Sequence, residues 1–141
     1  MKGQVSTYTF LEEHKRYIQP TIEEIDIFLK TAEHPFQTAD VACVLDISKD
    51  EVLKIMAEKG IKTIDEDAFF TIMSAGSNRI CVMYAREIEI GSPATYTAAQ
   101  IAYIYNLDEI LVKDACHKLQ IKEVTAFTMP LIFANIPYDE L

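Results

Sequence analysis

The sequence predicts an all-α fold with two three-helix repeats, a bridging helix between them and an N-terminal helical pair. Three observations lead to this prediction. The 141 residues include only four glycines and five prolines, which leaves little room for hairpin turns. Helix-start pairs, in which Ser or Thr precedes Glu or Gln by three residues, recur along the chain. One pattern of small, apolar and turn-forming residues occurs twice, sixty residues apart.

The repeated pattern covers residues 36–64 and 96–124 without a gap. The stretch "ADVACVLDIS" of residues 39–48 returns as "AQIAYIYNLD" at residues 99–108. Several positions are identical in the two copies: Ala39 and Ala99, Ala42 and Ala102, Val52 and Val112, Ile61 and Ile121, Lys62 and Lys122. Apolar class is kept at nearly every inward position while the polar positions change. We therefore interpret the pattern as a structural repeat rather than two generic amphipathic helix pairs.

The N-terminal segment, residues 1–35, is expected to form the helical pair. Capping pairs at Thr9–Glu12 and Thr21–Glu24 predict where its helices begin. The second helix is expected over about residues 21–33. Apolar residues at helical spacing define its inward face: Ile22, Ile25, Phe28 and Leu29.

The first repeat, residues 36–75, is expected to contain three helices. Asp46 is placed at the turn between the first two, because Asp and Asn tolerate the left-handed conformation. Ser48 is expected to cap the second helix and Gly60 to end it. The stretch "DEDAFFTIM" predicts the third helix. The inward residues of the first two helices are Val41, Val44, Leu45, Val52, Ile55 and Met56.

A bridging helix over residues 77–90, within the segment 76–95, is predicted to start at Ser77. Its apolar residues recur at helical spacing: Ile80, Met83, Tyr84 and Ile88. A strand is the alternative for this stretch.

The second repeat and the C-terminal tail occupy residues 96–141. A capping box at Thr97–Gln100 starts the first helix, and Asn106 takes the turn. The inward residues are Ile101 and Ile104, followed on the next helix by Val112, Ala115 and Leu119. The apolar tail is expected to lie across the body or a partner chain, and all parts are expected to pack as one body.

Composition and charge argue against nucleic acid and membranes as partners. Thirteen basic residues against twenty-two acidic ones give a formal net charge of −9, the wrong sign for neutralising phosphates. No stretch approaches twenty apolar residues, and no leader-like segment opens the chain. The cysteines form no close C-x-x-C pair, so a reducing cytoplasm is the expected location.

No catalytic, metal or cofactor site is predicted. Cys116 and His117 are adjacent, so on a helix they point about 100° apart and share one ion poorly. We interpret them as a buried thiol beside a surface imidazole, and His14 and His34 as surface or cap residues. Acidic pairs such as those near Glu23 and Asp65 fit solvated helix starts. The expected protein is not an enzyme and has no evident small-molecule ligand.

Each repeat resembles a helix-turn-helix unit, most closely those of excisionase-like and MerR-like regulators. The family's small residue at the helix crossing, the apolar residue after the turn and the buried β-branched residue of the second helix match residues of both copies: Ala42 and Ala102, Ile47 and Leu107, Val52 and Val112. The chain departs from the family in having Asp46 and Asn106 in place of the turn glycine, and it lacks a basic wing. The resemblance implies a small regulator of a DNA-binding class, while the missing wing and the acidic charge set this chain apart from that class.

Two functions follow as hypotheses. The first is a protein-interaction module that binds a second copy of itself or another regulatory protein. Tyr103, Ile110 and Leu111 are its expected interface residues, because a reading helix presents polar residues at such positions. The alternative is a sequence-specific regulator that binds double-stranded DNA through the first repeat. Its expected contact residues are Ser48, Lys49, Lys54, Lys59 and Lys62.

Overall fold

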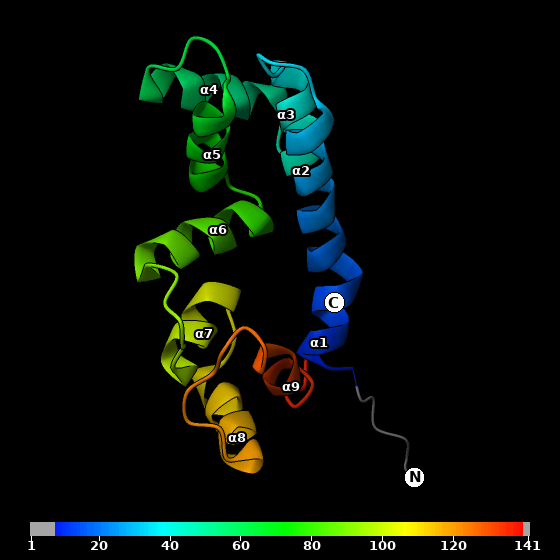
Figure 1. Ribbon diagram of the computed structural model, residues 1–141, viewed down its shortest axis with the longest axis vertical. Helices are drawn as coiled ribbons and strands as arrows, with labels where there is room; N and C mark the ends of the chain where they lie inside the picture. The colour runs from blue at the N-terminus through cyan, green and yellow to red at the C-terminus, as the bar shows by residue number, and fades with distance from the viewer. Residues whose placement is uncertain (1–7, 140–141) are drawn as a thin grey trace. The chain divides into compact units, whose positions relative to one another are not determined.

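The structure is a computed structural model that describes residues 8–139 (Figure 1). Its elements in chain order are α1 (Phe10–Glu13), the π-helical η1 (His14–Ile18), α2 (Gln19–Thr31), α3 (Thr38–Leu45), α4 (Lys49–Lys59), α5 (Glu66–Ala75), α6 (Arg79–Ile90), α7 (Ala98–Tyr105), α8 (Glu109–Leu119) and α9 (Met129–Phe133). Over residues 8–139 there is no β-strand, and extended segments meet only at isolated bridges. The predicted all-α class is confirmed.

The chain divides into two compact units. The central unit is Gln19–Glu89, and the terminal unit combines Met1–Ile18 with Ile90–Leu141. The predicted N-terminal segment is therefore shared between the units, and the bridging helix belongs almost entirely to the central one. The expected packing of all parts as one body stays a prediction.

The predicted N-terminal helical pair is wrong in one respect, because helix runs from Phe10 to Thr31 without a break. Thr9 forms the expected capping box with Glu12. Thr21 begins no helix and lies inside α2. Pro20 just before it has no N–H to donate, and the π-helical segment η1 ends two residues earlier, at Ile18. Ile22, expected to face inward, is 46% exposed.

Phe69 of α5 is the centre of the aromatic core in the central unit. Its ring is fully buried, with its centroid 5.7 Å from Phe28 and 5.9 Å from Phe36. Phe36 also donates its N–H to the carbonyl of Ile64 at 2.8 Å. The fully buried Val41, Leu45 and Val52 of α3 and α4 complete this core. Ile25 is the buried inward residue of α2, while Phe28 and Leu29 are half-buried.

The C-terminal tail packs on the N-terminal segment within the terminal unit. The N–H of Phe10 bonds the carbonyl of Ile136 at 2.9 Å, and the N–H of Tyr138 bonds the carbonyl of Tyr8 at 3.0 Å. Helix α9 contacts both α1 and α8 (Figure 1). Its buried residues Ile132 and Phe133 join the core around Phe10. The tail is therefore held by its own unit.

The segments 36–64 and 96–124 share several backbone features at the same spacing. An antiparallel bridge joins Phe36 to Ile64 in one and Tyr96 to Val124 in the other. The residues that end their helices, Asp46 and Gly60 in one and Asn106 and Gln120 in the other, all have positive φ angles between 56° and 68°. Each pair of helices thus begins and ends at corresponding positions.

Helix α6 confirms the predicted bridging helix but begins two residues later than expected. Asn78, and not Ser77, supplies the cap, since its Oδ1 accepts the N–H of Ile80 at 2.9 Å. Ile80 and Met83 are buried as predicted, and Tyr84 is half-buried. Ile88 was expected to face inward but is 51% exposed, so the last part of the apolar face of α6 is left in solvent.

Gly76 lies where the central unit has no room for a side chain. Its φ of −73° suits any residue, but a Cβ there would lie 2.7 Å from Cys81 Sγ. Gly76→Ala is therefore expected to lower the free energy of unfolding by about 1–3 kcal/mol through overpacking. Chemical denaturation measures this change. Adding Cys81→Ala removes the clashing sulfur and should recover part of the loss, whereas an equal cost of Gly76→Ala in both backgrounds would contradict the proposed clash.

Candidate functional site

Two helix pairs, α3–α4 and α7–α8, carry most of the residues that the sequence singles out as DNA-contact or interface residues. Asp46 ends α3 with φ 56° and ψ 47°, and Asn106 ends α7 with φ 56° and ψ 52°. After each turn the next N–H returns to the helix alanine, from Ile47 to Ala42 at 3.0 Å and from Leu107 to Ala102 at 2.9 Å. The predicted left-handed turns are confirmed, and α4 and α8 begin three residues after them.

Ser48 caps α4 as predicted, because its Oγ accepts the N–H of Glu51 at 3.0 Å. Glu51, three residues after Ser48, also has the spacing of a capping box, but the reciprocal half is absent because the Glu51 carboxylate bonds Ser77 instead. It accepts the N–H of Ser77 at 2.7 Å and its hydroxyl at 2.8 Å. Asn78 Nδ2 adds a bond to the carbonyl of Asp46 at 3.3 Å. Residues 77 and 78 therefore contact Glu51 in the first turn of α4 and Asp46 before it, while Ser48, Lys49 and Asp50 stay exposed.

The four lysines of the DNA hypothesis are all exposed, but the structure does not gather them on one face. Lys49, Lys54 and Lys59 follow at five-residue intervals on α4, so successive side chains point about 140° apart around the helix. Lys62 lies beyond the end of α4 at Gly60. Lysines spread around a helix in this way do not line up along one phosphate backbone.

Lys54 lies in a hollow whose charge is mostly negative. The hollow has a volume of about 450 Å³ and lies between α4 and the end of α5. Its lining combines Lys54 with three carboxylates and several small or apolar residues: Asp50, Glu51, Glu58, Ser48, Ile55, Ala75 and Ser77. A phosphate brought to Lys54 would meet these acidic side chains, so the electrostatics oppose DNA binding here.

The expected interface residues lie on α7 and α8. Ile110, at the second position of α8, is 67% exposed, and Tyr103 of α7 is 40% exposed. Leu111 is half-buried. Adjacent helical residues cannot both share the inward face, and Ile110 is the one of this pair that lies outside the core. Val112 and Ala115 fill the inward face of α8, as the periodicity predicts.

Further exposed apolar residues of the terminal unit were not predicted, among them Phe127 and Leu131. Phe127 is 90% exposed and Leu131 of α9 is 52% exposed. Phe127 lies in the turn before α9, where Thr125 and Thr128 hydrogen bond each other's backbone N–H groups at 2.9 and 3.1 Å. The sequence signal was the spacing of the two threonines, which marks a closed turn with its central side chains outward.

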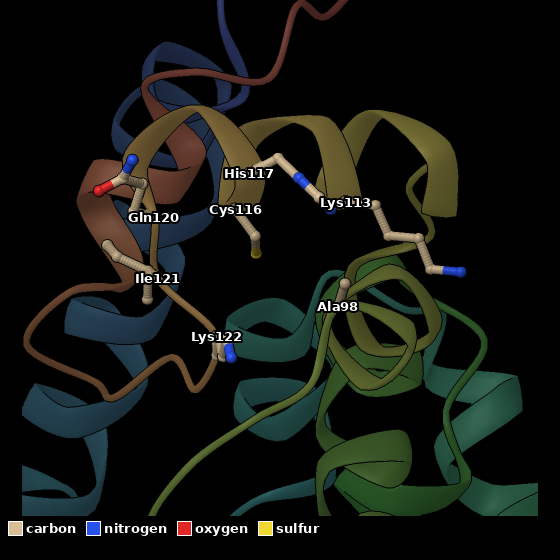
Figure 2. Close-up of a pocket in the computed structure, with 7 residues that line it drawn as sticks. All are labelled: Ala98, Lys113, Cys116, His117, Gln120, Ile121 and Lys122. Carbon is tan, nitrogen blue, oxygen red and sulfur yellow. The ribbon is translucent and has the colours of Figure 1, made fainter.

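A cavity of about 580 Å³ lies between the beginning of α7 and the second half of α8 (Figure 2). Its lining comes from Ala98, Lys113, Cys116, His117, Gln120, Ile121 and Lys122. Cys116 points from α8 into this space, and its half-buried position raises the pKa of its thiol by desolvation. The predicted contrast between a covered thiol and an exposed imidazole is therefore partly correct, but both residues line one cavity.

The other two histidines, His14 and His34, and the Cys81 thiol lie outside this cavity. His14, expected at the surface, is half-buried, and its ring centroid lies 5.3 Å from that of Phe133. His34 is exposed as expected and lies against Phe36. Burial, together with the nearby Glu51 charge, raises the pKa of the Cys81 thiol to about 11. Within the described ranges no three His, Cys, Asp or Glu side chains gather at a distance that would hold a metal ion.

Comparison with known proteins finds no matching family model, no similar curated protein and no similar solved structure. Between residues 8 and 139, no helix combines the length with the hydropathy that a membrane span requires.

Proposed function

We propose that this chain is a non-enzymatic regulatory module that uses a helix-turn-helix scaffold to bind protein, and that its partner is a second copy of the chain. The observation that carries this proposal is the 67% exposure of Ile110 at the beginning of α8. A helix that reads DNA presents polar or basic residues at its early positions. An exposed isoleucine there favours a protein surface instead.

The energetic argument concerns the aliphatic side chain of Ile110. Full burial of such a side chain gains about 1.5–3 kcal/mol relative to leaving it in water. Tyr103, on the preceding helix of the same unit, supplies a further exposed side chain with an apolar ring and a polar tip. A symmetric dimer would place the same surface of both chains in contact and cover these residues twice.

We further propose that residues 36–64 and 96–124 are two copies of one helix-turn-helix unit. The paired bridges and left-handed helix ends at a constant sixty-residue spacing support this proposal. The two copies differ where function is expected, since Asp50 in the first copy corresponds to Ile110 in the second. The resemblance to excisionase-like and MerR-like units then concerns the scaffold and not the ligand. The three free thiols, with Cys43 exposed, favour the cytoplasm as the place of action.

Sedimentation velocity over a range of concentrations tests the proposed dimer. Ile110→Asp is expected to weaken self-association by about tenfold or more, because a charged side chain would replace an aliphatic contact on both chains. Leu53→Asp is the matched control, since Leu53 is a 46% exposed leucine on α4 of the central unit. It should leave the association unchanged. A protein that stays monomeric at every concentration, or equal effects of both variants, would contradict the proposal.

The DNA alternative predicts a different result. We expect no retention of pooled duplex fragments at moderate salt, because acidic side chains surround Lys54 and the lysines are scattered. A shift assay over increasing salt, with Lys49→Glu and Lys54→Glu as variants, checks this expectation. Binding that falls steeply with salt and weakens in both variants would favour DNA over protein as the partner of this scaffold.

A further inference from the structure

The cavity between α7 and α8 has a lining chemistry that the proposed interaction role does not use. Lys113, His117 and Lys122 supply basic side chains, and no carboxylate is part of the lining. This composition contrasts with a chain whose formal net charge is −9. The hollow beside α4 shows the opposite composition, with three acids around one lysine. The α7–α8 cavity is thus a local site of positive charge.

The basic groups come from two different parts of the chain. Lys113 and His117 are four residues apart and project from the same side of α8 (Figure 2). Lys122 follows the left-handed residue Gln120, which turns the chain back below α8. Lys113 Nζ also lies 2.9 Å from a Glu109 carboxylate oxygen, but Glu109 does not line the cavity and the lysine side chain is 60% exposed. The exposed Lys113 side chain can therefore reorient toward a ligand.

The remaining lining residues add hydrogen-bond donors and apolar surface without negative charge. Partial burial raises the pKa of the Cys116 thiol, so it is protonated and neutral at physiological pH. Gln120 offers an amide that donates as well as accepts hydrogen bonds. Ala98 and Ile121 provide apolar contacts. Apolar walls with a few convergent polar groups are typical of sites for small organic ligands.

The corresponding positions of the central unit show that this lining is particular to the second helix pair. Sixty residues earlier, Lys113, His117 and Gln120 correspond to Leu53, Ala57 and Gly60. Cys116 corresponds to Met56, while Ile121 and Lys122 are the same residues in both segments. The scaffold therefore folds with Leu and Ala at these positions, and the polar donors of α8 are not needed to form the helix pair.

We propose that this cavity binds a small organic anion, specifically a monophosphate that carries an aromatic or other apolar group. Lys113, His117 and Lys122 contact the phosphate, because charge-assisted hydrogen bonds to an anion are the strongest that such donors form. The apolar group packs against Ile121 and Ala98. The volume of about 580 Å³ falls within the range of about 300–1,000 Å³ found for small-molecule sites.

Alkylation of Cys116 provides the test, with the full chain and phenyl phosphate as the probe. Iodoacetamide labelling at constant ionic strength, mapped by peptide mass spectrometry, follows each thiol separately. Increasing phenyl phosphate should slow labelling of Cys116 saturably, because an occupied cavity shields the sulfur. Cys43 is exposed and lies outside the cavity, so its labelling rate should not change. Benzyl alcohol, which has the ring without the charge, should give no protection.

Two variants identify the groups responsible. Lys113→Leu with His117→Ala introduces the residues found at the corresponding positions of the central unit, and should raise the half-saturating phenyl phosphate concentration by about tenfold or more. Lys118→Leu is the matched control, because it removes one charge from α8 outside the cavity. Half-saturating concentrations are compared, since removing a cation alters the reactivity of the thiol itself.

Three results would overturn the proposal. The first is the absence of saturable protection of Cys116 by phenyl phosphate. The second is equal protection by benzyl alcohol, which would indicate an apolar crevice without anion recognition. The third is an unchanged half-saturating concentration in the Lys113→Leu and His117→Ala double variant. Circular dichroism of each variant confirms that a loss of protection does not arise from unfolding.

Discussion

Replacing Phe10 with alanine is expected to lower the free energy of unfolding by about 3–5 kcal/mol, the range found when a buried aromatic ring is removed. Phe10 is fully buried, and its ring centroid lies 4.8 Å from Phe133, 5.3 Å from Tyr138 and 5.7 Å from Tyr105. These three rings come from α9, the segment that follows it and α7. The substitution therefore removes the contact that joins both ends of the chain to the second helix pair.

Chemical denaturation of Phe10→Ala against Phe127→Ala makes the comparison direct. Phe127 lies in the same unit and undergoes the same chemical change, but it is 90% exposed and should cost little stability. Limited proteolysis adds a local readout, because loss of the Phe10 contacts should expose the segment after Met129 to cleavage. Similar stability losses in the two variants would contradict the packing of the tail on the N-terminal segment.

Local chemistry explains which elements of the fold were predictable. The Thr97–Gln100 capping box and the left-handed turn at Asn106 depend on residues within a few positions of each other, and both occur as predicted. The same is true of Ser48 as the cap of α4. Helix starts and turns are set by neighbouring side chains and backbone groups, so the sequence contains the information needed to locate them.

Contacts between distant residues explain what the sequence did not reveal. Glu51 fits a capping box by its spacing, yet it bonds Ser77, which lies twenty-six residues away. Similarly, Thr21 has the pattern of a helix start, but the helix already passes through it from Phe10. Exposed Ile22 and Ile88 follow a helical period without a neighbour to cover them. Periodicity indicates which face is apolar, while burial depends on the elements that pack against it.

The two candidate sites also differ in whether the sequence alone could predict them. Ile110 was predictable because Val112 and Ala115 already fill the inward face of its helix. The basic cavity was not, although Lys113 and His117 share one face of α8 by their four-residue spacing. Lys122 joins them only because Gln120 adopts the left-handed conformation with φ 57°, at a position where glycine is the usual residue. That turn was not evident from the residue types.

Phe69→Ala is expected to have a comparably large effect in the central unit, about 3–5 kcal/mol on the free energy of unfolding. Phe69 is fully buried, and its ring lies 5.6 Å from Phe70, 5.7 Å from Phe28 and 5.9 Å from Phe36, measured between centroids. The substitution removes the ring at the centre of this core and leaves a cavity.

Hydrogen exchange followed by mass spectrometry shows where each substitution acts. Phe69→Ala should cause its largest loss of amide protection within Gln19–Glu89, because its contacts all lie in that unit. Phe10→Ala should cause its largest loss in residues 8–18 and 90–139, for the corresponding reason. The two variants thus serve as controls for each other. If both gave the same protection pattern over the described chain, the central and terminal units would open as one cooperative body, and the division by contacts would not describe how the protein unfolds.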